Sequence, residues 1–205
     1  QRQMCIRDRE IEKLSFKEQY LRGLCKLAHI EDCVEQWQHR AEQDIGLTEY
    51  LGLTGEEHKT FLCGGRDALA ALLEPQRRKQ RFVLYQLQLD EENAIPFAFK
   101  DITALKAAGY EQPPAAMYYV AGSGEIYCPA EESDDTLLKR LFADCRERLP
   151  EGCRGRPMAV SDVVELNHGA KRAYYYVSGQ DQFRQVKFSP MLAKKEIPEK
   201  TQERF

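Results

Sequence analysis

The feature that most constrains the fold of this chain is a change of hydrophobic period near residue 80. Before it, apolar residues recur at spacings of three and four, which is typical of amphipathic helices. After it, Val83, Tyr85, Leu87 and Leu89 occupy alternate positions and define one face of a β-strand. We therefore predict an α+β protein, with a helical N-terminal segment followed by a small, mostly antiparallel sheet packed with one or two helices.

The helical part begins with a capping box, in which Ser15 and Glu18 each satisfy a free backbone N–H of the other. The apolar spacing after this box predicts one long amphipathic helix of roughly six to eight turns, which ends at Gly46. The apolar stripe of this helix is Tyr20, Leu21, Leu24, Leu27, Ala28, Ile30, Val34 and Trp37.

Shorter helices are expected before the period changes. One covers residues 47–51, and the next begins at a second capping box formed by Thr54 and Glu57. Gly64-Gly65 is a predicted helix stop, and a last helix covers 67–73.

Helix and strand signals alternate in the rest of the chain. Asp101 predicts the N-cap of a short helix that ends near Ala108. Gly122-Ser123-Gly124 predicts a turn between two short strands at 117–120 and 125–128.

Ser133 starts a further helix, whose acidic first turn suits the helix dipole. Strands follow at 158–166, 172–177 and 184–188. The turn at Asn167-His168-Gly169 predicts a hairpin between the first two, because Asn and Gly tolerate positive φ.

These signals divide the chain into four parts. Residues 1–9 look like a sequencing-adapter scar and are excluded from fold reasoning. Residues 10–76 are the helical region, 77–188 the α+β domain, and 189–205 an exposed tail with little apolar content.

The segment Val160, Ser161, Asp162, Val163 and Val164 resembles the signature of the YodL-like domain family. The opening strand, the middle hairpin, the helix and the closing strands of that family find counterparts in this chain, in order, at 83–87, 117–127, 137–142, 174–177 and 186–188. One departure is the loop Ser178–Phe183, where the family has Asp-Ser and a Gly-Phe pair. The resemblance covers roughly 82–188 and excludes the helical region.

Such domains occur chiefly in bacterial proteins, often on phages, plasmids and conjugative elements, and no general enzymatic activity attaches to them. The resemblance therefore implies an accessory or interaction role and names no substrate.

A metal site and a catalytic site are the first two alternatives to consider. Cys25, His29 and Cys33 follow one another at i+4 and share a helix face, but a closed zinc site needs a fourth ligand, so packing of the thiols as small apolar groups is favoured. Ser161 and Asp162 are adjacent on a predicted strand and point to opposite faces unless a bulge intervenes, with His168 in a turn.

We favour a bulge or a bond from Ser161 or Asp162 to the backbone over catalysis. No P-loop, dinucleotide-binding or zinc-protease motif is present in the sequence. We therefore predict a protein without enzymatic activity, metal or cofactor.

Two surfaces remain as candidates for binding a partner. A basic strip of Arg77, Arg78, Lys79 and Arg81, with Lys194 and Lys195, suits nucleic acid, although the net charge of −3 favours a solvated linker. The tyrosines of the predicted strands alternate across them, so those that face outward are candidate anchors for a protein interface. The tyrosines concerned, some of which must lie in the core, are Tyr118, Tyr119, Tyr174, Tyr175 and Tyr176.

The leading hypothesis is a non-enzymatic accessory protein of a bacterium or mobile genetic element that binds a protein partner. The alternative is a nucleic-acid-associated or anti-defence protein of a phage, plasmid or conjugative element. Seven scattered cysteines without a Cys-x-x-Cys pair indicate reduced thiols, and no apolar stretch approaches the roughly 20 residues that span a bilayer. A cytoplasmic location without membrane contact is expected.

Overall fold

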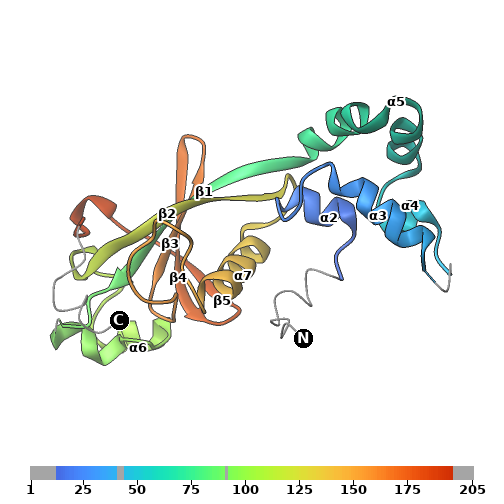
Figure 1. The fold of residues 1–205 in the computed structure, drawn as a ribbon. Coiled ribbons are helices and arrows are strands. Elements are labelled where there is room, and N and C mark those ends of the chain that lie inside the picture. Colours follow the sequence, from blue (N-terminus) through green and yellow to red (C-terminus); the bar gives the residue numbers. More distant parts are fainter. Residues whose placement is uncertain (1–12, 41–43, 91, 196–205) are drawn as a thin grey trace. The chain divides into compact units, whose positions relative to one another are not determined.

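The computed structural model describes residues 13–40, 44–90 and 92–195, and it separates the chain into two compact units (Figure 1). Unit 1 combines residues up to 79 with 126–132, and unit 2 combines 80–125 with the residues from 133 onward. The predicted scar at 1–9 lies outside the described residues. The α+β class is confirmed, with helices first and a sheet with helices after them.

Unit 1 is built from four α-helices and a 3-10 turn among its described residues. They are α2 (Phe16–Leu21), α3 (His29–Gln38), α4 (Leu47–Leu51), α5 (Gly55–Leu73) and η1 (Glu74–Gln76). Both predicted capping boxes are confirmed, that of Ser15 with Glu18 on α2 and that of Thr54 with Glu57 on α5.

The single long helix predicted from Ser15 is wrong, because the chain leaves the helical conformation between α2 and α3. Gly23 adopts φ +70°, a left-handed conformation that ends α2. A Cβ at this position would lie 2.7 Å from the ring of Tyr127, so the break also makes room for a strand residue distant in sequence. The helix stop predicted at Gly64-Gly65 appears as a kink within α5 at Gly65, with φ +70°.

The core of unit 1 is formed by apolar side chains from all four helices. Its buried members are Phe16, Tyr20, Leu21, Ile30, Cys33, Leu51, Leu53, Leu69 and Leu73. The helices are therefore held by their own apolar faces.

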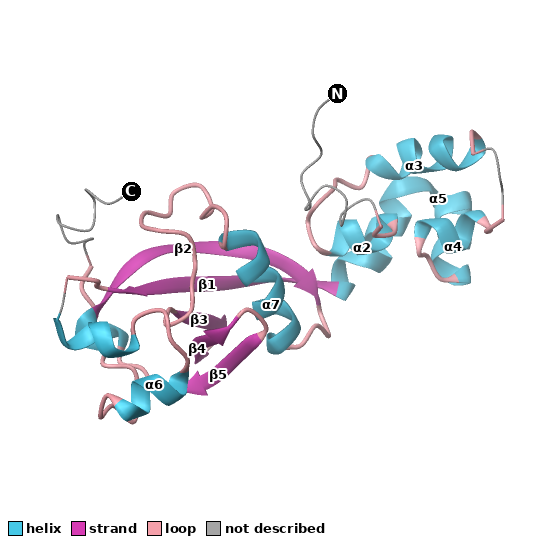
Figure 2. Ribbon diagram, turned by 90° about the horizontal axis from the view of Figure 1, so that it is seen from below, coloured by secondary structure: helices cyan, strands magenta, loops and turns pink. Residues whose placement is uncertain are grey.

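Unit 2 is organised on a five-stranded sheet with the order β2-β1-β3-β4-β5, drawn in magenta in Figure 2. The strands are β1 (Arg77–Leu87), β2 (Tyr118–Pro129), β3 (Val163–His168), β4 (Lys171–Gly179) and β5 (Gln182–Val186). The pairs β1·β3, β3·β4 and β4·β5 are antiparallel, in agreement with the predicted sheet. β1 has neighbours on both sides, so it is a central strand.

The turn predicted at Gly122-Ser123-Gly124 is wrong, because β2 runs without a break through these residues. A Cβ on Gly122 would lie 2.4 Å from Cys153 Sγ, and one on Gly124 would lie 2.8 Å from the ring of Phe82. The two glycines are therefore required by close packing against the strand rather than by a reversal of the chain.

Two helices pack against the strands of unit 2. These are α6 (Ile102–Ala107), N-capped by Asp101 as predicted, and α7 (Asp134–Cys145), N-capped by Ser133 (Figure 2). The β4 residues Tyr176 and Val177 point to opposite faces of the sheet.

One face, with Tyr176, packs against Leu105 of α6 in a core completed by Tyr85, Leu87, Phe97, Tyr118, Val163 and Phe188. On the other face Phe183, the partner of Val177, meets Phe142 of α7 with ring centroids 6.2 Å apart. Unit 2 is therefore a sheet with apolar side chains on both faces.

The tail predicted to be exposed from Ser189 is partly packed. A 3-10 turn, η4 (Pro190–Leu192), leads to Ala193, which is buried. Lys194 then pairs with β2, donating its N–H to Tyr118 O and accepting from the N–H of Val120. Residues 196–205 lie outside the described residues.

Candidate functional site

The signature segment begins before β3 and not inside a strand, which corrects the strand predicted from residue 158. Ser161 and Asp162 are both fully buried, and Ser161 adopts φ +79°. Two backbone hydrogen bonds join this turn to Val177 of β4: Ser161 N–H donates to Val177 O, and Val177 N–H donates to Asp162 O. The predicted local irregularity at Ser161-Asp162 is thus confirmed, as a tight turn at the head of β3.

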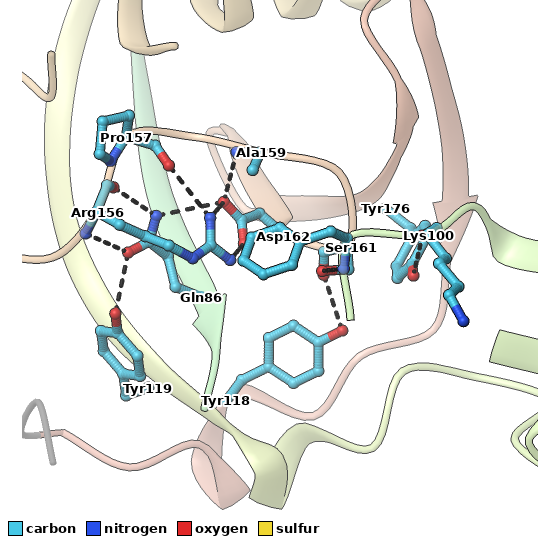
Figure 3. Close-up of polar contacts among 11 residues, drawn as sticks. Gln86, Lys100, Tyr118, Tyr119, Arg156, Pro157, Ala159, Ser161, Asp162 and Tyr176 are labelled. Atoms are coloured by element: carbon cyan, nitrogen blue, oxygen red, sulfur yellow. Dashed lines mark hydrogen bonds and ion pairs between the residues drawn. The ribbon is translucent and has the colours of Figure 1, made fainter. Parts of the chain in front are cut away.

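Asp162 forms an ion pair with Arg156 in the interior of unit 2 (Figure 3). Arg156 Nη1 donates to Asp162 Oδ2 at 3.0 Å, and Nη2 donates to Oδ1. The side chains are 6% and 0% exposed, respectively. Asp162 also accepts from the N–H of Ala159 at 2.9 Å, which is the predicted bond between side chain and backbone.

Gln86 of β1 joins this pair to the strands of the sheet. Its amide nitrogen donates to Arg156 O at 2.7 Å and to Asp162 Oδ2 at 3.3 Å. Its amide oxygen accepts from Arg156 N–H at 3.1 Å and from the hydroxyl of Tyr119 at 3.0 Å. The loop at Arg156 is therefore held by a side chain from a central strand.

Burial raises the pKa of Asp162, while the Arg156 guanidinium, the Ala159 N–H and the Gln86 amide offset part of this rise because each favours the carboxylate. A buried ion pair with further hydrogen bonds of this kind gives little net stability, but removing one partner is costly. Its contribution is to fix one geometry for the loop.

Ser161 connects the interior to an exposed aromatic residue. Its hydroxyl oxygen accepts the backbone N–H of Phe99 at 3.1 Å, and its carbonyl accepts the hydroxyl of Tyr118 at 2.9 Å. Arg156 lies beneath the same residue, with its guanidinium carbon 4.8 Å from the centre of the Phe99 ring. Phe99 is 51% exposed and has φ +58°.

Positive φ is strained for a residue with a bulky side chain, at a cost of about 1–3 kcal/mol. The surrounding contacts must therefore impose it on Phe99. Strained backbone of this kind clusters at binding and catalytic sites, which makes Phe99 the centre of the candidate site.

All the residues of this arrangement fall within one segment that a known family matches. The YodL-like domain family matches residues 81–188, more than half of the 205 residues. The chain belongs to this family. No curated protein and no solved structure matches the chain.

The short segment before Phe99 in the YodL-like domain is fastened to the core and carries a second exposed apolar residue. It is the 3-10 turn η2 (Glu92–Phe97), in which Ala94 and Phe97 are fully buried. Ile95, between these two, is 63% exposed. Because Ala94 and Phe97 are buried on either side of it, the Ile95 side chain is held at the surface.

The tyrosine surface expected from the sequence is largely absent from the YodL-like domain. Tyr118 and Tyr119 of β2 and Tyr176 of β4 are completely buried, and their hydroxyls donate to partners in the core. Tyr174 and Tyr175 are partly exposed, and Tyr175 donates to Asp134 at 2.6 Å. Some of the five tyrosines are therefore core residues, as predicted, and the possible interaction surface is wrong for the three that are buried.

The predicted basic strip is not a connector, because its residues form the beginning of β1. Within unit 1 Arg77 pairs with Glu74 at 2.6 Å and stacks on the rings of Tyr20 and Tyr127. Arg78 donates to Glu132 O at 2.8 Å. Within unit 2 Arg81 lies 3.5 Å from Glu125.

These contacts occupy several of the charges that a nucleic acid would need. In the tail, Lys194 donates to Gln88 at 2.6 Å. Nucleic-acid binding by Arg77, Arg78, Lys79, Arg81, Lys194 and Lys195 stays a prediction.

The cysteine and histidine candidates are not brought into a common site. Cys25 lies in the break between α2 and α3, Cys33 is buried in α3, and His29 contacts Asp32 at 3.1 Å. Among residues 13–40, 44–90 and 92–195, no three His, Cys, Asp or Glu side chains are grouped as metal ligands. His168 lies apart from Ser161 and contacts Asp134 at 3.0 Å.

Burial raises the pKa of Cys25, Cys33 and Cys153, which keeps these thiols protonated. All six described cysteines are free thiols, as predicted. Within the described part of the chain no helix is long and apolar enough to span a membrane.

Sequence reasoning missed Gln86, Arg156 and Phe99. Only Gln86 left a signal: it occupies a position of β1 that shares a face with Phe82 and Leu84, where an apolar residue is expected. A polar residue at an inward position indicates a buried hydrogen-bonded network. The role of Phe99 depends on contacts with residues more than 50 positions away, so no local pattern announces it.

Proposed function

We propose that this protein is a non-enzymatic accessory protein of a bacterium or bacterial mobile genetic element, which acts in the cytoplasm by binding another protein. The observation that carries the proposal is the pair of exposed apolar residues, Ile95 and Phe99, on a segment fixed to the core. Bulky apolar side chains held rigidly at a surface are typical anchors of protein interfaces.

The chemistry of the network supports binding over catalysis. Apart from Arg156 Nε, which is buried without a hydrogen-bond partner, the polar side-chain groups of Arg156, Asp162, Gln86 and Ser161 bond to one another, to Tyr119 or to the backbone, in a region closed to solvent. A catalytic group has to reach a substrate from a cleft. Here the polar groups hold a loop in place, and the exposed residue that contacts them, Phe99, is apolar.

Site-directed photocrosslinking tests the proposal. The full chain would carry benzoylphenylalanine in place of Ile95 and be produced in bacterial cells, with the same replacement at Met191, which is 96% exposed, as the matched control. We expect a discrete protein adduct from position 95 that is lost with Phe99→Ala and absent from position 191. Equal adducts at both positions, together with salt-dependent DNA binding by the purified chain, would overturn the proposal.

A further inference from the structure

The surface around Phe99 also indicates what kind of partner it binds, an inference that rests on the proposed function. Two properties of the surface decide the question. One is the charge beneath the Phe99 ring, and the other is the charge of the residues that flank Ile95 and Phe99.

The inner face of the Phe99 ring is already used by a cation. Arg156 lies 4.8 Å from the ring centre, and its charge draws on the same ring electrons that a second cation would need on the outer face. A cationic partner group centred on Phe99 is therefore disfavoured. An aliphatic or aromatic side chain gains from burying the ring without this competition.

The flanking side chains are predominantly acidic. Among residues 90 and 92–101, Asp90, Glu92 and Asp101 are the exposed acidic residues and Lys100 is the exposed basic one. The carbonyl of Lys100 accepts a hydrogen bond from the hydroxyl of Tyr176 (Figure 3). Glu92 belongs to the same turn as Ile95, and Asp101 follows Phe99 by two residues. Such a rim repels phosphate and attracts Lys and Arg.

We propose that the surface formed by Asp90 and residues 92–101 binds a segment of another protein in which an apolar side chain, seated on Ile95 and Phe99, is flanked by Lys or Arg. The apolar contact supplies the affinity, and the acidic rim selects for basic flanks and speeds association. Nucleic acid is disfavoured as the occupant of this surface, since bases that stack on Phe99 bring phosphates close to the carboxylates.

Selection from a phage-displayed library of random peptides on the immobilised full chain tests the inference. We expect enriched peptides that combine a large apolar residue with Lys or Arg. Their binding should weaken roughly tenfold or more with Phe99→Ala and about twofold to fivefold with Glu92→Gln. Met191→Ala and the exposed Glu147→Gln are the matched controls and should leave the dissociation constant unchanged.

The outcomes separate the two proposals. Enriched peptides that need Phe99 but carry acidic flanks, or that ignore Glu92→Gln, overturn the basic partner and leave the binding function standing. Peptides that bind the Phe99→Ala chain as tightly as the unaltered chain overturn both. Circular dichroism and thermal unfolding of each variant verify that it is folded.

Discussion

Arg156 and Asp162 are joined inside unit 2 by an ion pair that solvent does not reach, with side-chain exposures of 6% and 0%. They lie six residues apart in a stretch without regular secondary structure, immediately before β3. The pair turns this loop into a rigid support. Phe99 rests on its outer side, over the Arg156 guanidinium.

Removal of one partner of this pair should be strongly destabilising. Asp162→Ala leaves a buried guanidinium without its carboxylate, and we expect a loss of about 3–5 kcal/mol. Replacing both residues by apolar ones, Arg156→Met with Asp162→Leu, should restore most of that loss. Hydrogen exchange of β1 and β3 amides measures the change locally; a double variant no more protected than Asp162→Ala would contradict the argument.

Phe99 offers a test of backbone strain. Because its φ is +58°, a Cβ is unfavourable at this position and glycine is not. Phe99→Gly should therefore be more stable than Phe99→Ala by about 1 kcal/mol, although glycine is normally the less stable residue of the two. Urea unfolding of the two variants gives the difference, and an alanine variant of equal or greater stability would show that the residue is relaxed.

The glycines of β2 should respond to a methyl group according to what it meets. Gly122→Ala places a Cβ 2.4 Å from Cys153 Sγ and 2.7 Å from its Cα, and should cost about 1–3 kcal/mol. Gly179→Ala in β4 meets only ordinary contacts with Gln182, beginning at 3.5 Å, and serves as the control. Equal stability of the two variants would contradict the continuous strand.

Those glycines illustrate what the sequence reveals and what it does not. The caps at Ser15, Thr54, Asp101 and Ser133 were predictable, because each bonds to a backbone N–H three residues later. The turn predicted at Gly122 is wrong because the residue that requires a glycine there, Cys153, is distant in sequence and leaves no local signal.

In the candidate site, too, local features were predictable and contacts between distant residues were not. The Ser-Asp segment was recognisable as a family signature and as a local irregularity, both of which depend on adjacent residues. Its partners Gln86 and Phe99 lie on other elements, 76 and 62 positions away from Asp162 and Ser161. Contacts of that length are set by the sheet register, which the period of one strand does not specify.

The buried tyrosines predict how the stability of unit 2 depends on pH. Burial raises the pKa of Tyr119 to about 12, from an ordinary value of 10.0. The folded state therefore holds the proton more tightly than the unfolded state, and this contribution to stability is complete below pH 10 and declines as the pH rises towards 12.

Unfolding free energies measured between pH 9 and 11 should accordingly fall, and fall less steeply in Tyr119→Phe. Phenolate absorbance of the folded chain checks the cause, since Tyr119 should remain protonated until unfolding. A Tyr119→Phe variant with the same slope as the unaltered chain would show that this phenol does not contribute.

The central claim is that the family segment holds Phe99 in place, and amide hydrogen exchange at Phe99 tests it most directly. An exposed residue outside helices and strands normally exchanges fast, but the bond from Phe99 N–H to Ser161 Oγ predicts clear protection in the folded chain. Ser161→Ala should speed the exchange several-fold, with the β3 amides still protected. A Phe99 amide that exchanges as fast as in an unstructured peptide would contradict the account.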